Sequence, residues 1–189
     1  MRKRLFLALL IALAERGVLG HSRRVACYAA RLGKRLGLNK LWLDRLAVAA
    51  LLHDAGKVAV DAKVLHKAAR LDKVEVREMR RHTVYGEQIL SGLFPVEVVK
   101  AAVAHHECLD GSGYPRGLRG REIPFLAQVI AVADVFDALT ADDRPYRKPM
   151  GLVEVKEAMV AEAGKLNPEI IDLFFHQRLH MSGRRWKIR

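Results

Sequence analysis

The sequence has little cysteine and little proline. Its 189 residues include 2 cysteines, Cys27 and Cys108, and 6 prolines. Two cysteines are too few for the disulfide framework of a small secreted domain, so we expect a reduced, cytoplasmic protein. Cys108 stands beside two histidines, but no second cysteine lies at zinc-finger spacing. We therefore expect Cys108 to be neither a metal ligand nor a nucleophile.

Long apolar runs are also missing. Residues 5–14 are apolar and follow Arg2-Lys3-Arg4, a pattern that a signal peptide shares. This run is shorter than the about 20 residues that a membrane span requires. We therefore expect no membrane span and a first domain helix here. Because that helix is apolar nearly all round, it could pack against something outside this chain.

Acidic residues are outnumbered, 21 against 33 basic residues, which gives a formal net charge of +12. Such a surface favours anionic partners, namely nucleotides, nucleic acid or an anionic membrane, and charge alone does not choose among them. The basic tail at 182–189 is typical of a solvated or disordered terminus. No recognised nucleic-acid-binding motif is present, so we expect no nucleic-acid partner.

No segment alternates apolar and polar residues as a half-buried strand does. Hydrophobic residues make up 51% of the chain, enough for a core, and their spacing is helical through most of it. We predict one all-α domain over residues 1–189, with a Gly- and Pro-rich loop inside the stretch 108–123. The predicted helices span 3–16, 21–36, 40–54, 73–91, 95–107, 124–140, 151–164 and 168–180, and the other irregular stretches are 56–72 and 141–150.

His53 and Asp54 end the third predicted helix. Apolar residues precede His53 by three, four and seven positions, which places it on the buried face. Gly56 is then expected to end the helix. A single buried histidine is usually a hydrogen-bonded core residue, but a buried carboxylate beside it is costly unless it is paired or bound to a metal.

His105 and His106 likewise follow a buried helical face, and together with Glu107 they demand a common partner. Imidazole nitrogen atoms are frequent ligands of transition metals. Asp134 follows the apolar run 125–133, so its carboxylate is buried if that helix is buried. Alone it could be a structural partner of an arginine, whereas beside the histidines it is a candidate ligand.

His21 and His82 fit the same role, since each lies on a helix with an apolar inner face, although either one alone is more often structural. The complete set is too large for one tetrahedral zinc ion. It suits two ions about 3.5–4 Å apart, with Asp54 as the natural bridging carboxylate. The candidate ligands are His21, His53, Asp54, His82, His105, His106 and Asp134.

These residues resemble a known signature. His21, His53-Asp54 and Asp134 look like the H…HD…D pattern of the HD superfamily of phosphohydrolases. Residues 53–57 (HDAGK) resemble the HDxGK motif of its HD-GYP branch, and residues 105–115 (HHECLDGSGYP) are similar to the HHExxDGxGYP motif that names the branch. Two further segments, DVFDALT at 134–140 and RPY at 144–146, extend a likeness that runs from about residue 21 to 165.

The resemblance implies an HD-type helical bundle with a GYP loop and a bi- or trinuclear centre, often of iron or manganese. It implies hydrolysis of a cyclic dinucleotide, cyclic di-GMP to pGpG or on to GMP, by a metal-activated hydroxide. Asp54 and Lys57 would be catalytic, and the GYP loop would also contact a partner protein. The implied substrate contacts are Lys57, Asp110, Gly113, Tyr114, Pro115, Arg144 and Arg147.

Three features depart from the family pattern. The approach to His21, residues 16–20, is short. Asp61, Ala68 and Ala69 stand where proline, proline and glycine are common, so the segment after Lys57 is a candidate mobile lid. The sensory domain that such proteins often carry is also absent, which points to an input domain outside this sequence.

Three other functions compete with a cyclic-dinucleotide phosphodiesterase. The first is a non-catalytic sensor of a cyclic dinucleotide that signals through the GYP loop, and the intact ligand set argues against it. The second is an HD phosphohydrolase that acts on another nucleotide, which the GYP segment disfavours. The third is a nucleic-acid binder that uses the basic tail, and no recognised nucleic-acid-binding motif supports it.

The number of metal ions is testable. Some HD-GYP proteins bind a third ion through a glutamate one helical turn before the first histidine, and here that position is Gly17. Glu15 lies six residues before His21 and would face away on a continuous helix, whereas a bend at Gly17 or Gly20 could bring it in. We expect two peaks in anomalous diffraction from crystals grown with excess iron or manganese. A third well-occupied peak on Glu15 would contradict this.

Overall fold

The computed structural model describes residues 2–141, 150–162 and 164–176, and all regular structure in these ranges is helical. The predicted all-α class is therefore confirmed. The α-helices are α1 (Arg2–Glu15), α2 (Leu19–Arg35), α3 (Lys40–Leu52), α4 (Ala62–Leu65), α5 (Lys73–Arg80), α6 (His82–Leu90), α7 (Val96–Val103), α8 (Phe125–Thr140), α9 (Leu152–Ala161) and α10 (Pro168–His176), with 3-10 turns η1 (Ala55–Ala59) and η2 (Gly120–Glu122).

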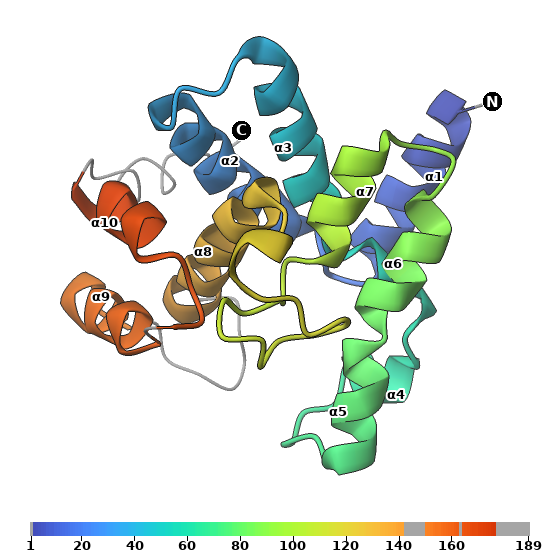
Figure 1. The fold of residues 1–189 in the computed structure, drawn as a ribbon. Helices are drawn as coiled ribbons and strands as arrows, with labels where there is room; N and C mark the ends of the chain where they lie inside the picture. The colour runs from blue at the N-terminus through green and yellow to red at the C-terminus, as the bar shows by residue number, and fades with distance from the viewer. Residues whose placement is uncertain (1, 142–149, 163, 177–189) are drawn as a thin grey trace, which may run out of the picture.

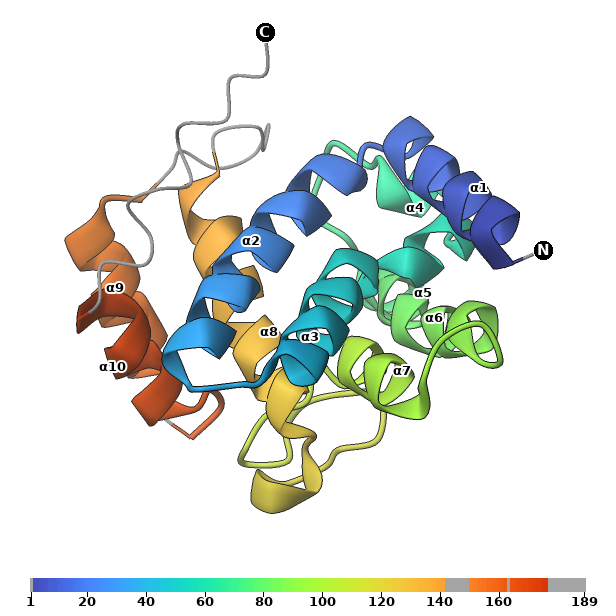
Figure 2. The same ribbon diagram turned by 90° about the horizontal axis from the view of Figure 1, so that it is seen from above.

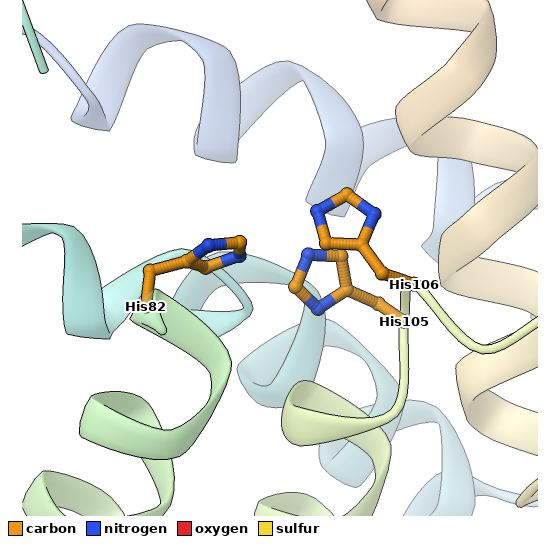
Figure 3. Close-up of side chains that lie close together, drawn as sticks. All are labelled: His82, His105 and His106. Atoms are coloured by element: carbon orange, nitrogen blue, oxygen red, sulfur yellow. The ribbon is translucent and has the colours of Figure 1, made fainter. Parts of the chain in front are cut away.

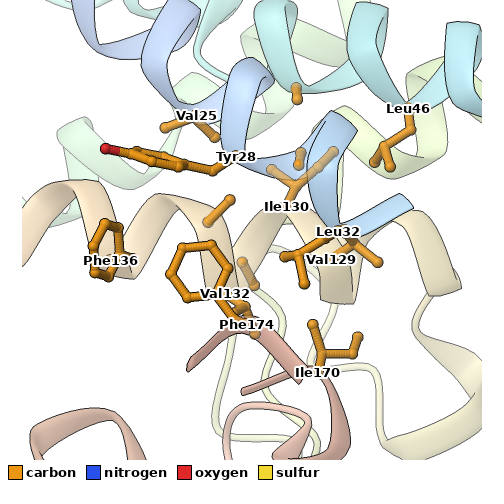
Figure 4. Packing of buried hydrophobic residues seen from close by; sticks show 14 of the residues in the cluster. Val25, Tyr28, Leu32, Leu46, Val129, Ile130, Val132, Phe136, Ile170 and Phe174 are labelled. Atoms are coloured by element: carbon orange, nitrogen blue, oxygen red, sulfur yellow. The ribbon is translucent and has the colours of Figure 1, made fainter. Parts of the chain in front are cut away.

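Helices α2, α3 and α8 form the centre, with α9 and α10 on one side and α1, α6 and α7 on the other (Figures 1 and 2). The larger apolar cluster joins α2, α3, α8 and α10 (Figure 4). In it the ring of Phe136 contacts Tyr28 and Phe174 edge-on, with centroid distances of 5.1 and 4.7 Å. Aromatic pairs prefer this edge-to-face geometry, which fixes α10 against α8.

A second apolar cluster joins α1, α3, α6 and α7 and includes Leu13, Leu52, Leu90 and Val103. Because α3 contributes Leu46 to the first cluster and Leu52 to the second, its C-terminal end lies where the two clusters meet. That end carries the HDAGK segment.

Helix α1 buries one face and leaves another exposed. Leu5, Leu7 and Ile11 are 46%, 58% and 52% exposed, as the nearly uniform apolar composition of this helix led us to expect. No single helix in the described ranges has the length and apolar composition of a membrane span. Residues 4–15 and 19–35 meet those criteria only as a pair, which is bent by 113°.

The predicted helix over 73–91 is wrong, because it breaks at Arg81 into α5 and α6. At the break, the Thr83 hydroxyl donates to the Arg80 carbonyl and Nδ1 of His82 lies 2.7 Å from the Met79 carbonyl oxygen. Side chains here occupy carbonyl groups that a continuous helix would pair with backbone amides. The helices predicted at 40–54 and 95–107 also end early, at Leu52 and Val103.

The stretch predicted as irregular after Lys57 holds both η1 and α4. Asp61, which stands at a position where proline is common in the family, caps α4 by accepting a hydrogen bond from the Lys63 amide at 2.8 Å. Much of the irregular stretch at 141–150, the end of the helix predicted at 168–180 and the basic tail at 182–189 lie outside the described residues.

Gly56 does not end α3, which already stops at Leu52; it lies inside η1. A Cβ atom on Gly56 would sit 1.9 Å from the His82 carbonyl oxygen and 2.4 Å from the Gly86 nitrogen. Its lack of a side chain lets the backbone of η1 touch α6. This contact brings the HDAGK segment beside His82.

Gly56→Ala should therefore destabilise the fold, by about 1–3 kcal/mol, because the backbones must separate. Gly86→Ala is the matched control, since its Cβ would meet Gly56 at an ordinary 3.5 Å. Alanine also favours a helix interior over glycine by up to about 1 kcal/mol. Urea denaturation measures both variants, and equal stabilities would contradict the close approach.

Candidate metal centre

The structure brings all seven candidate ligands together from distant parts of the chain. His53, Asp54, His82 and His105 are at most 2% exposed. The donor atoms of the seven residues form three overlapping groups. Within each group, all donor atoms lie within 4.8 Å of one another. The groups are His82 with His105 and His106 (Figure 3), His21 with His53 and Asp54, and His53 with His105 and Asp134.

Three of the histidines are oriented by helix C-termini. The last carbonyl groups of an α-helix have no amide partner within the helix. Nδ1 of His53, His82 and His105 lies 2.7, 2.7 and 2.6 Å from the carbonyl oxygen three residues earlier, at the ends of α3, α5 and α7. A carbonyl oxygen can only accept, so each Nδ1 donates, and in its neutral form each ring has its lone pair on Nε2.

These Nε2 atoms make no hydrogen bond in the described part of the chain, although Nε2 of His53 and His82 lies 3.4 and 3.5 Å from the Asp54 carboxylate. Nε2 of His53, His82 and His105 and Oδ1 of Asp54 are buried without a hydrogen bond. A buried polar atom left unsatisfied costs about 1–3 kcal/mol. Imidazole nitrogen and carboxylate oxygen atoms are the ligands that divalent transition metals take, so the residues fit a metal centre.

Burial also sets the charge of the imidazole rings. It lowers the pKa of His82 and His105, and lowers that of His106 to about 4. Charged imidazolium is disfavoured in a low-dielectric interior. These rings are therefore neutral near pH 7 and can offer a lone pair to a metal ion.

The carboxylates carry the negative charge of the site. Burial alone would raise the pKa of Asp54, but the Lys57 ammonium outweighs it and holds that pKa well below its usual range. Burial also opposes ionisation of Asp134, whose pKa is likewise lowered, chiefly by the hydrogen bond from His21. Both groups stay ionised, and their potential favours a cation.

His21 also contacts Asp137, a residue that was not among the candidates from the sequence. Nε2 of His21 lies 2.9 Å from Oδ1 of Asp134, and its Nδ1 lies 2.7 Å from Oδ2 of Asp137. Burial alone would lower the pKa of His21, but these two carboxylates raise it to about 9. The three-residue spacing of Asp134 and Asp137 on one helical face was the signal that could have revealed this.

The loop that contains Gly113, Tyr114 and Pro115 within the stretch 108–123, here called the GYP loop, covers one side of the cluster. The Tyr114 ring lies over His106, with centroids 4.7 Å apart and planes tilted by 31°, and the guanidinium of Arg80 lies 4.9 Å from the Tyr114 centroid. The Tyr114–Pro115 peptide is cis. A Cβ atom on Gly113 would come within 2.5 Å of the His106 carbonyl oxygen, so glycine allows the loop to fold back.

Glu107 does not share the ligand cluster, contrary to our expectation of a common partner with the adjacent histidines. Its buried carboxylate accepts hydrogen bonds from the backbone amides of Arg116 at 2.7 Å and Leu118 at 2.9 Å. Glu107 therefore holds the far end of the GYP loop against the end of α7.

The predicted substrate contacts have varied surroundings. Lys57 is 24% exposed, and its Nζ donates to Oδ2 of Asp54 at 2.7 Å. Asp110 is exposed and accepts from the backbone nitrogen and hydroxyl of Ser112. Arg144 and Arg147 lie outside the described residues. Glu15 ends α1 and is exposed.

A family profile described as HD domain matches residues 6–170. The chain belongs to the HD domain family. Its resemblance to the HD-GYP type is confirmed by its sequence relatives. The chain is 47% identical over 135 residues to the 3′3′-cGAMP-specific phosphodiesterase 3 of Vibrio cholerae, and 39% identical over 158 residues to a cyclic di-GMP phosphodiesterase of Thermotoga maritima.

These alignments cover 69% and 82% of this chain but 28% and 43% of the two relatives, so the chain spans less than half of each. Two solved structures share the fold. Bd1817, an HDG"Y"P protein from Bdellovibrio bacteriovorus, aligns with a TM-score of 0.69 and 21% identity over 86% of this chain and 53% of its own. The HD domain of PgpH from Listeria monocytogenes gives 0.64 and 14% over 91% and 95%.

Removing the Glu107 carboxylate should loosen the GYP loop. Glu107→Ala leaves two amides without their acceptor, which costs about 1–3 kcal/mol for each group that stays buried. We expect faster hydrogen exchange at Arg116 and Leu118. Glu122→Ala is the control, because Glu122 accepts a single backbone amide at an exposed turn. Unchanged exchange in Glu107→Ala would contradict the assigned role.

Proposed function

We propose that this domain is a metal-dependent phosphodiesterase that hydrolyses a cyclic dinucleotide. The observation that carries the proposal is the convergence of buried atoms that make no hydrogen bond, Nε2 of His53, His82 and His105 and Oδ1 of Asp54, beside the GYP loop. Relatives named for cyclic di-GMP or 3′3′-cGAMP phosphodiesterase activity support the substrate class. The net charge of +12 suits a phosphate-rich ligand.

The metal centre in this proposal holds two divalent transition-metal ions, iron or manganese. When bound, the ions would activate water for attack on phosphorus and draw charge from the phosphoryl oxygens. Their ligands would be His21, His53, Asp54, His82, His105, His106 and Asp134.

The residues of the chain contribute in distinct ways. Hydrogen bonds from Nδ1 fix the rings of His53, His82 and His105, so little reorganisation is needed when ligands bind. Lys57 places an ammonium group at the edge of the cluster, where it would stabilise negative charge developing on the phosphate. The Tyr114 ring, stacked on His106, borders the substrate.

Two further contacts belong to the proposal. Arg144 and Arg147 would hold the phosphates of the ligand, as the family motif implies. The exposed residues Asp110, Ser112 and Arg116 would give the GYP loop a surface for a protein partner. The domain would work in the cytoplasm, with Cys27 and Cys108 as free thiols, and take its signal from an input domain.

The substrate is tested by product chromatography. Protein loaded with manganese or iron is incubated with cyclic di-GMP, 3′3′-cGAMP, and nucleotide mono- and triphosphates. We expect linear dinucleotide or mononucleotide from at least one cyclic dinucleotide, and none from Asp54→Ala or His53→Ala, which should also lose metal. Binding without turnover would indicate a sensor, and turnover of the other nucleotides alone would indicate a different phosphohydrolase.

Lys57→Ala separates substrate contact from metal binding. A charge-assisted hydrogen bond contributes about 1.5–3 kcal/mol, so kcat/KM should fall at least about tenfold with metal content unchanged. Lys63→Ala, which removes an exposed lysine of α4, is the control for charge and should behave as the wild type. Loss of metal from Lys57→Ala, measured by elemental analysis, would show that the assigned role is wrong.

A further inference from the structure

Asp137 lies one helical turn after Asp134 on α8 and is 1% exposed. Its Oδ2 lies 2.7 Å from Nδ1 of His21. Arg24, one turn after His21 on α2, donates to the same carboxylate from Nε at 2.7 Å and from Nη2 at 3.0 Å. Two hydrogen bonds from Arg24 therefore hold the Asp137 carboxylate, which also contacts the imidazole of His21.

The position of His21 in α2 explains why the acceptor for its Nδ1 is a carboxylate side chain and not a backbone carbonyl. His53, His82 and His105 follow helix C-termini, where a backbone carbonyl of the last turn accepts from Nδ1. His21 is the third residue of α2, and the free backbone groups at that end of a helix are amides, which only donate. An acceptor for Nδ1 of His21 must therefore come from another element, and α8 supplies it.

We propose that Asp137, held by Arg24, is the positioning residue that fixes the ring of His21 so that its Nε2 faces the metal centre. A carboxylate that accepts from Nδ1 sets the tautomer and raises the basicity of the ligating nitrogen. The inference rests on the proposed function in so far as His21 is a metal ligand. Asp137 touches neither metal nor substrate in this role.

The test measures metal binding rather than turnover. Chelator-stripped protein is titrated with Mn²⁺ by calorimetry, and the Co²⁺ absorption spectrum reports the ligand field. Asp137→Asn keeps the shape of the side chain and removes its charge, and we expect about 10–100-fold weaker binding at one site. Asp44→Asn, at a 60% exposed position on α3, is the charge-matched control and should bind as the wild type.

A double-mutant cycle separates positioning from general damage to the fold. In a His21→Ala background, Asp137→Asn should cause no further loss, because its effect passes through His21. Arg24→Gln, which loosens the hold on Asp137, should weaken binding in the same direction and also depend on His21. It serves as the test if Asp137→Asn does not fold, as judged by circular dichroism.

Wild-type affinity in Asp137→Asn, or an equal loss with and without His21, would overturn the inference. An unchanged affinity in His21→Ala would do the same, since His21 would then be no ligand. These outcomes are distinct from failure of the proposed function: a protein that binds Mn²⁺ as expected but hydrolyses no cyclic dinucleotide would overturn the substrate assignment and leave the role of Asp137 standing.

Discussion

Hydrogen bonds between histidine Nδ1 atoms and the carbonyl groups at helix C-termini are the constraint on which the site depends. Helices α3, α5 and α7 each end just before a ligand histidine, and each end supplies the acceptor. The interaction lies at the end of the helix, orients the ring and leaves Nε2 without a hydrogen bond. Helix length and ligand geometry are therefore one property of the fold, and lengthening any of these helices would misplace a ligand.

The site also lowers the stability of the fold, because it buries charged and polar groups. Two ionised carboxylates and several unpartnered polar atoms lie where the two apolar clusters meet. Those clusters offset the cost, with Phe136, Tyr28 and Phe174 locking α2, α8 and α10 together. Metal binding to the folded state would add stability by linkage, so the chain trades intrinsic stability for a prepared ligand set.

Two close contacts join the parts that carry ligands. Gly56 lets η1 touch α6, which brings Asp54 near His82, and Gly113 lets the GYP loop return to the end of α7. The Glu107 carboxylate holds that loop by accepting hydrogen bonds from two of its backbone amides, and Tyr114 lies over His106. The spacing of residues within the motif is thus explained by packing as well as by chemistry.

The sequence by itself determined the helical class and the candidate ligands, because apolar spacing marks buried faces and polar residues on such faces stand out. It did not determine the break at Arg81, the part that Gly56 plays or the task of Glu107, since each depends on which backbone groups another element brings near. Asp137 lay in a quoted motif, yet its contact with His21 joins positions 116 residues apart. Only the tertiary structure decided that, because packing of α2 against α8 makes the two side chains neighbours.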